Sequence, residues 1–143
     1  MKKYLLAIAI VAALYFGWGQ ARGPEPLQAP ATVADDALAS AFREQKSGVQ
    51  VTGEGVVAKM LSDDNDGDRH QRFILSLASG QSVLVVHNID VAPRLTTLEK
   101  GDSVAFNGVY EWNSKGGLIH WTHHDPNGQH QSGWLKHNGE TYQ

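Results

Sequence analysis

The feature that most constrains the fold is an alternation of apolar and polar residues that begins at residue 49. Alternate side chains of a β-strand face opposite sides of a sheet, so this pattern predicts half-buried strands rather than helices. Turn residues such as Gly, Asn, Asp and Pro separate the alternating stretches, as they do in small all-β domains. The predicted strands cover residues 49–61, 71–77, 82–89, 102–112 and 118–124.

The number and spacing of these strands predict a closed sheet. A connection over residues 93–99 follows the third strand, and five strands with such a connection are typical of a five-stranded OB-like Greek-key barrel. Gly53 and Gly55 in the first strand allow the sharp bend that closure of a barrel requires. The predicted fold class is therefore all-β with a small α component, and another small barrel or a sandwich is the alternative.

A single helix is predicted ahead of the barrel, over residues 32–48. Thr32 and Asp35 have the spacing of a capping box, with Asp in place of the usual Glu, and Gly48 is placed to end the helix. Apolar residues recur at helical spacing between them, which predicts a helix packed on the side or end of the domain. A helix that binds a partner is the alternative. The barrel domain then spans residues 49–143 and ends in a His-rich hairpin and a tail.

The first 21 residues have the layout of an export signal. Two lysines precede an apolar run, and Gly19 and Ala21 form a small-x-small exit. The run is shorter than the roughly 18–20 residues that span a bilayer as a helix, so we expect cleavage after Ala21 and a periplasmic or secreted protein. The aromatic end of the run keeps an uncleaved anchor as the alternative, with residues 1–21 as the membrane contact. Residues 22–31 are proline-rich and predict an extended linker.

Charge and cysteine content narrow the class of protein. The whole chain has a net charge of −3, and residues 1–21 hold two lysines and no acidic residue, so the remainder carries −5. A negative domain has no bulk attraction for phosphate backbones, and we therefore expect no bulk nucleic-acid binding. The chain has no cysteine, which excludes a disulfide framework and leaves packing to hold the domain together.

An acidic turn at residues 63–68 has the beginnings of a calcium loop. Asp64, Asp66 and Asp68 alternate like the first ligands of such a loop, which requires a bidentate Glu at the twelfth position. That position holds Ile74 or Leu75, depending on the register. The sequence therefore favours a solvated hairpin turn over a calcium site.

Four of the seven histidines lie within residues 116–130. If residues 118–124 form a strand, His120 and His124 share one face and lie about 13 Å apart, too far to bind one zinc ion, while His123 faces the other side. A helix would gather the three imidazoles on one face, but the flanking glycines and the following proline disfavour it. The strand reading therefore excludes a simple three-histidine metal site.

A second arrangement depends on the turn at residues 125–128. Its Asp-Pro-Asn-Gly sequence is typical of a type I turn, which would bring His123 opposite His130, with Cβ atoms about 5 Å apart. His123, His130 and Asp125 are then candidate catalytic residues for general acid–base chemistry. Alternatively, His123, His124 and His130 are candidate ligands of a divalent metal such as Zn²⁺. Solvent-facing hairpin residues are the structural alternative.

The candidate ligand-binding residues carry imidazole, guanidinium or indole groups near these elements. They are His70, Arg72, His87, Trp112, His120, Trp121 and His124. His87 ends an apolar strand, so a buried and hydrogen-bonded role is its alternative. Tryptophans in a small domain without cysteine belong to the core more often than to a stacking platform for bases or sugars.

Four sequence words carry a family resemblance: GDRHQRF at 67–73, HNID at 87–90, YEWNSKGGLIHWTHHDP at 110–126 and GWLKHNG at 133–139. Together they resemble the uncharacterised bacterial domain-of-unknown-function family that carries the number 3465. The resemblance covers roughly residues 48–143. It implies an exported bacterial protein with an OB-like barrel and assigns no catalytic residue.

Two functions of different class follow from these observations. The favoured one is an exported OB-like binding module with a His/aromatic face, whose ligand is a nucleic acid, an oligosaccharide, a small molecule or another envelope protein. The alternative is a phosphodiesterase or nuclease that uses two histidines, with or without a metal. The segment 112–143 holds five histidines, so pH sensing is a third hypothesis.

Overall fold

The computed structural model describes residues 33–143. The predicted signal or anchor, the proline-rich linker and the capping residue Thr32 lie outside the described residues. Within residues 33–143, no helix is long and apolar enough to cross a membrane.

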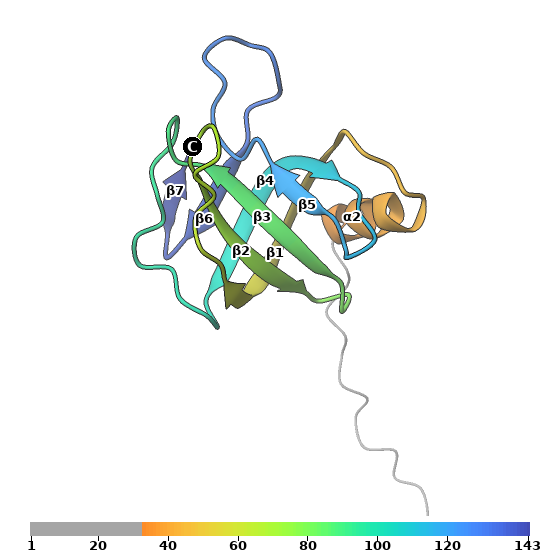
Figure 1. Cartoon of the computed structure of the whole chain (residues 1–143). Coiled ribbons are helices and arrows are strands. Elements are labelled where there is room, and N and C mark those ends of the chain that lie inside the picture. Colours follow the sequence, from red (N-terminus) through yellow and green to blue (C-terminus); the bar gives the residue numbers. More distant parts are fainter. Residues whose placement is uncertain (1–32) are drawn as a thin grey trace, which may run out of the picture. The chain divides into compact units, whose positions relative to one another are not determined.

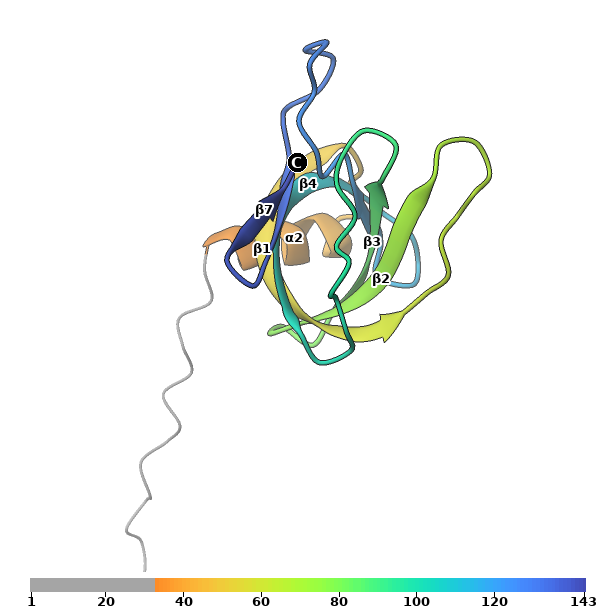
Figure 2. The same ribbon diagram turned by 90° about the vertical axis from the view of Figure 1, so that its left-hand side faces the viewer.

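Five strands close into a barrel, as the alternation predicts (Figures 1 and 2). The order around it is β1-β2-β3-β5-β4, and a pairing between β1 and β4 closes the ring. All of these pairings are antiparallel except that between β3 and β5. The strands are β1 (Val49–Met60), β2 (His70–Leu77), β3 (Ser82–Asn88), β4 (Ser103–Glu111) and β5 (Leu118–His120). The predicted OB-like fold class is thus confirmed.

The long first strand holds the barrel together because it pairs with two neighbours. Residues 49–56 of β1 pair with β4, and residues 55–60 pair with β2. Gly55 lies where the two pairings overlap, and a Cβ there would approach the Leu75 Cβ to 3.0 Å. The register shifts between Val57 and Lys59, just past this point. The bend predicted from the glycines therefore coincides with the change of partner.

Three parts of the chain contribute side chains to the core: the strands, the β3–β4 connector and the helix. Alternate residues of each strand point inward, such as Phe73 and Leu75 of β2. Leu95 comes from the β3–β4 connector, which lies across one open side of the barrel in Figure 2. The side-chain amide of Gln71 donates to the Leu95 carbonyl and accepts from its backbone N–H, which fixes the connector over the core. Leu38 of helix α2 (Val33–Arg43) joins the same cluster.

The structure differs from the predicted elements by more than one residue in three places. The helix ends at Arg43 rather than at Gly48, because Gln45 adopts a positive φ of 54° and Lys46 N–H bonds back to the Ala41 carbonyl, which is the geometry of a helix C-cap. The fifth strand ends at residue 120 and not at 124. The tail forms two further strands, β6 (Trp134–His137) and β7 (Glu140–Tyr142), which extend the sheet from β4.

Candidate functional site

A cavity of about 630 Å³ lies on the outer face of β3 and β5, at the ends where both strands finish. Its floor includes Val86 and Asn88 of β3 and Leu118 and His120 of β5. These residues alternate with inward-facing neighbours, so the floor is the outside of the barrel wall. Residues 121–133, which we call the His loop, form another wall and project from the barrel (Figure 1).

The His loop begins where Trp121 breaks the strand. Trp121 has a positive φ of 50°, a left-handed conformation that a strand cannot continue. The alternation therefore shifts, and Thr122 and His123 are both buried while His124 is exposed. The shared face predicted for His120 and His124 depended on a strand that continues to residue 124, and the strand ends at His120.

The predicted turn over residues 125–128 is present and organises the loop. Gly128 N–H bonds to the Asp125 carbonyl at 3.3 Å. The Asp125 carboxylate accepts backbone N–H groups from Asn127 at 2.9 Å, from His130 at 2.8 Å and from Gln129. Burial opposes the charged form, but these hydrogen bonds outweigh it and lower the pKa of Asp125 below its ordinary value. Asp125 is therefore the ionised centre around which the loop folds.

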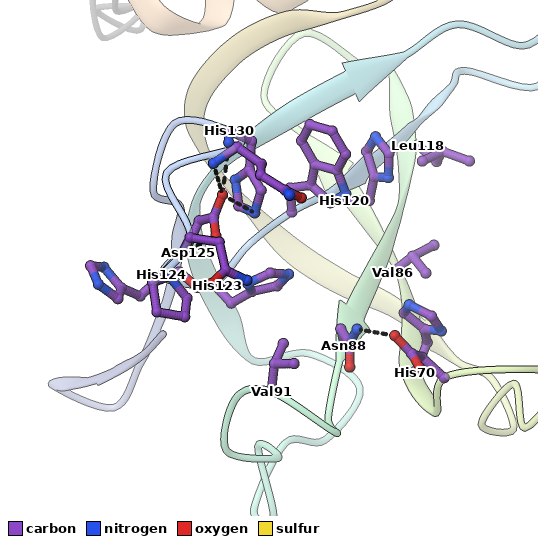
Figure 3. Close-up of a pocket in the computed structure, with 15 residues that line it drawn as sticks. His70, Val86, Asn88, Val91, Leu118, His120, His123, His124, Asp125 and His130 are labelled. Atoms are coloured by element: carbon purple, nitrogen blue, oxygen red, sulfur yellow. Dashed lines mark hydrogen bonds and ion pairs between the residues drawn. The ribbon is translucent and has the colours of Figure 1, made fainter.

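The loop doubles back and brings His123 beside His130, although no β-ladder joins them. The two rings lie edge to face with centroids 5.1 Å apart (Figure 3). Trp121 stacks on His130 at 4.5 Å and on His120 at 5.1 Å. The backbone register differs from that of a simple hairpin, because the His123 carbonyl accepts the N–H of Gly133. The rings of His120, Trp121, His123 and His130 thus form one aromatic cluster.

Hydrogen bonds fix the nitrogens of the two central imidazoles. His123 Nδ1 donates to the His124 carbonyl at 2.9 Å, so the neutral ring carries its lone pair on Nε2. His130 Nδ1 donates to the Gln131 carbonyl at 2.7 Å, and its Nε2 lies 3.7 Å from Asp125 Oδ2. Both His130 nitrogens can donate at once only in the doubly protonated ring. The His123 Nε2 atom is thus the freer of the two for an external ligand.

His87 anchors the loop from inside the barrel. It is fully buried, its Nε2 donates to the Pro93 carbonyl at 2.9 Å, and its Nδ1 accepts the Thr122 hydroxyl at 2.7 Å. Burial lowers the pKa of His87 to about 4; the bond to Pro93 opposes the shift, and the charges of His123 and His70 add to it. The ring is therefore neutral at physiological pH and joins the β3–β4 connector to the His loop.

The structure gathers most of the predicted site residues and excludes three. The predicted residues that line the cavity are His70, His120, Trp121, His123, His124, Asp125 and His130. His87 lies beneath it, as the buried alternative for that residue proposes. Arg72 lies outside it and donates to the Ser62 carbonyl, and Trp112 packs against the core.

The three candidate metal ligands do not converge. His124 points away from His123 and His130 in Figure 3 and its Nδ1 lies 3.1 Å from the Ser132 hydroxyl. Among residues 33–143, no group of three or more His, Cys, Asp or Glu side chains is arranged to hold a metal ion. Two carboxylates of the acidic turn also have other partners: Asp63 pairs with Arg94, and Asp68 accepts a hydrogen bond from the Asn88 amide.

Four residues that line the cavity or hold the His loop were not predicted from the sequence: Val86, Asn88, Thr122 and Gly133. Val86 and Asn88 could have been found, because the alternation of β3 turns them away from buried Val85 and His87. Thr122 and Gly133 could not, because their roles depend on contacts between distant segments. A Cβ on Gly133 would lie 2.3 Å from the Trp121 carbonyl oxygen and 2.5 Å from that of Asn107, so this residue must be glycine for the loop to close.

Comparisons with known proteins agree with the resemblance seen in the sequence. A search of curated proteins found no match. A family model matches residues 26–143, a longer span than the sequence words covered. The chain therefore belongs to the family described as protein of unknown function (DUF3465).

Proposed function

We propose that this protein is an exported binding module whose ligand occupies the cavity beside the His loop. The observation that carries the proposal is the assembly of that cavity: imidazoles from β2, β5 and the His loop meet around one space of about 630 Å³. Such a volume is typical of small-molecule sites, which are lined by apolar groups and a few oriented polar ones. Export remains a prediction from residues 1–21.

The rigidity of the walls supports binding. Thr122 is tied to His87, and three backbone N–H groups converge on Asp125. A site whose walls are already ordered loses less conformational entropy when it takes a ligand. The exposed Trp121, at 43 % relative exposure, adds an indole edge to the cavity.

The test introduces a charged side chain into the cavity. Leu118→Arg fills the floor, whereas Val56→Arg places the same side chain at an exposed position on β1 that does not line it. Both variants are screened by tryptophan fluorescence against oligosaccharides, oligonucleotides and small anions. We expect any ligand of the wild type to lose at least about tenfold in affinity, roughly 1.4 kcal/mol, in the first variant only. Equal losses in both variants would refute this location.

A phosphodiesterase is the second candidate, because Asp125, His130 and His123 do come together. Two-histidine catalysis needs one nitrogen of each ring free for substrate, and His130 directs both of its nitrogens at Gln131 and Asp125. The geometry thus favours binding. Incubation with labelled RNA and DNA, in chelator and in zinc, tests the alternative. Cleavage abolished by His123→Ala but kept in His124→Ala would replace the binding module with the enzyme.

A further inference from the structure

Imidazoles are the basic groups of the cavity. Among the described residues that line it there is no lysine or arginine, but there are five histidines. Arg69 and Arg72 lie close in sequence, yet they bond to Asp90 and to the Ser62 carbonyl. The charge that the cavity offers to a ligand therefore depends on protonation of its histidines.

The carboxylates of the cavity are already engaged. Asp125 accepts three backbone N–H groups and faces His130, and Asp68 accepts the Asn88 amide at 3.0 Å. Asp125 therefore has little acceptor capacity left, whereas exposed Asp68 keeps acceptor positions beyond its bond to Asn88. A hard metal ion takes about six to eight oxygen ligands, and the lining offers only one carboxylate with open positions, so it is poorly suited to such an ion.

The five imidazoles differ in their acidic partners. His120 Nε2 lies 3.3 Å from Glu111, and His130 Nε2 lies 3.7 Å from Asp125. Within residues 33–143, His70 and His123 make no ion pair. Both line the cavity, and both lie close enough to His87 for their charges to act on it. A charged His70 or His123 therefore has no carboxylate of its own.

Asp68 lines the same cavity as His70 but accepts the Asn88 amide and makes no ion pair with that ring, and the other groups near the two rings supply no free carboxylate. His123 meets His130 edge to face and has neutral His87 beneath it. His70 also has His87 nearby and acts electrostatically on Asp90 of the connector. Asp90 is bonded to the Arg69 side chain at 2.7 Å and to its backbone N–H at 2.8 Å, so its charge is already compensated.

We infer that the cavity binds an oxyanion group of its ligand between His70 and His123, and that a proton is taken up as it binds. The proton is required by the geometry of His123: Nδ1 donates to the His124 carbonyl, so Nε2 can donate to an anion only when the ring is an imidazolium. This inference rests on the proposed function and names its ligand class. Sulfate, phosphate esters and carboxylates share the recognised group.

Sulfate is the first probe, because its own charge is constant over the range used. Titration calorimetry at about pH 7.5 and about pH 5.5, in buffers of different ionisation enthalpy, measures affinity and proton uptake together. For each proton taken up, we expect the affinity to rise by up to about tenfold per unit fall in pH. Glucose 6-phosphate and glucuronate then separate a phosphate ester from a carboxylate as the preferred anion.

Three matched variants locate the effect. His123→Gln keeps a hydrogen-bonding side chain that does not titrate, so it should lose the pH dependence contributed by that ring; His70→Gln should do likewise. Lys100→Gln removes an exposed positive charge that does not line the cavity and should stay within about twofold of the wild type, as expected for a distant surface charge. Equal loss in all three variants would indicate general surface charge and overturn the inference.

Other outcomes of the binding experiments distinguish failure of the anion site from failure of the proposed binding function. A neutral oligosaccharide or Zn²⁺ that binds in the cavity while sulfate does not would overturn the anion site and leave the binding module standing. Sulfate that binds with the same affinity at both pH values would overturn the proton uptake. If no probe binds and none of the screened ligands changes the fluorescence of Trp121, both proposals fail.

Discussion

At the scale of the residue, His87 shows how a polar side chain in a small core can position a surface loop. Both of its ring nitrogens have a hydrogen-bond partner, so burial of the ring leaves no polar atom unsatisfied. The Thr122 hydroxyl donates to it, and Thr122 lies between two residues that line the cavity. The orientation of Trp121 and His123 is therefore fixed from the interior of the barrel.

The low pKa of His87 makes stability depend on pH. Its pKa is about 4 in the folded protein against an ordinary value of 6.5. Between these values the unfolded chain binds a proton that the folded protein does not, so stability is full above 6.5 and falls as the pH approaches about 4. The shift corresponds to about 3 kcal/mol. We expect denaturant unfolding of His87→Gln to lose this part of the slope between about pH 4 and 6.5.

The control for this measurement is His124→Gln, in which an exposed imidazole is removed. Its unfolding free energy should follow that of the wild type over the same range of pH. If His87→Gln and the wild type lose stability in parallel on acidification, His87 is not the group responsible.

At the scale of the element, the His loop depends on a close approach of two backbones. Gly133 lies against the carbonyls of Trp121 and Asn107, and its N–H bonds to the His123 carbonyl. Any side chain at this position must push the loop away from β4. The loop is thus held at its base by Gly133 and at its tip by Asp125.

Gly133→Ala should therefore destabilise the fold by about 1–3 kcal/mol through overpacking and should also separate the rings of the loop. The expected readouts are a lower denaturation midpoint and an altered fluorescence of Trp121. Gln131→Ala, an exposed change two residues away, should alter neither. A Gly133→Ala protein with unchanged stability and spectrum would contradict the packing described here.

The sequence predicted strands and turns better than it predicted which side chains of the His loop are buried and which are exposed. The alternation located β1 to β4, and Asp125-Pro-Asn-Gly128 located the turn, because these signals are local. The positive φ of Trp121 has no local signal, since nothing in its neighbours requires it. Its cause is the tertiary fit of Thr122 beneath the cavity and of Gly133 against β4, which a single sequence does not reveal.

At the scale of the whole molecule, the C-terminal tail is part of the barrel wall rather than a cover over its opening. β6 pairs with residues 105–107 of β4, and Leu135 is fully buried in the common core. β6 therefore begins immediately after the His loop, so the loop is fixed to the sheet at both ends, by β5 and by β6.

Truncation of the Leu135 side chain should lower the unfolding free energy of the entire domain. Leu135→Ala should cost about 2–5 kcal/mol, the range for a large-to-small change in a packed interior. Lys136→Ala, at the next and outward-facing position, should cost less than about 0.5 kcal/mol in the same thermal or denaturant unfolding. A small effect at Leu135 would mean that the tail does not belong to the cooperative unit.

The central claim is that the His loop folds back on itself and places His123 against His130 over an anchor made by Thr122 and His87. Nuclear Overhauser spectroscopy of the folded protein tests this directly. We predict cross-peaks between the ring protons of His123 and His130, together with cross-peaks between the His87 ring and Thr122. Spectra of a folded protein in which both sets of cross-peaks are missing would contradict the arrangement and remove the basis for the proposed site.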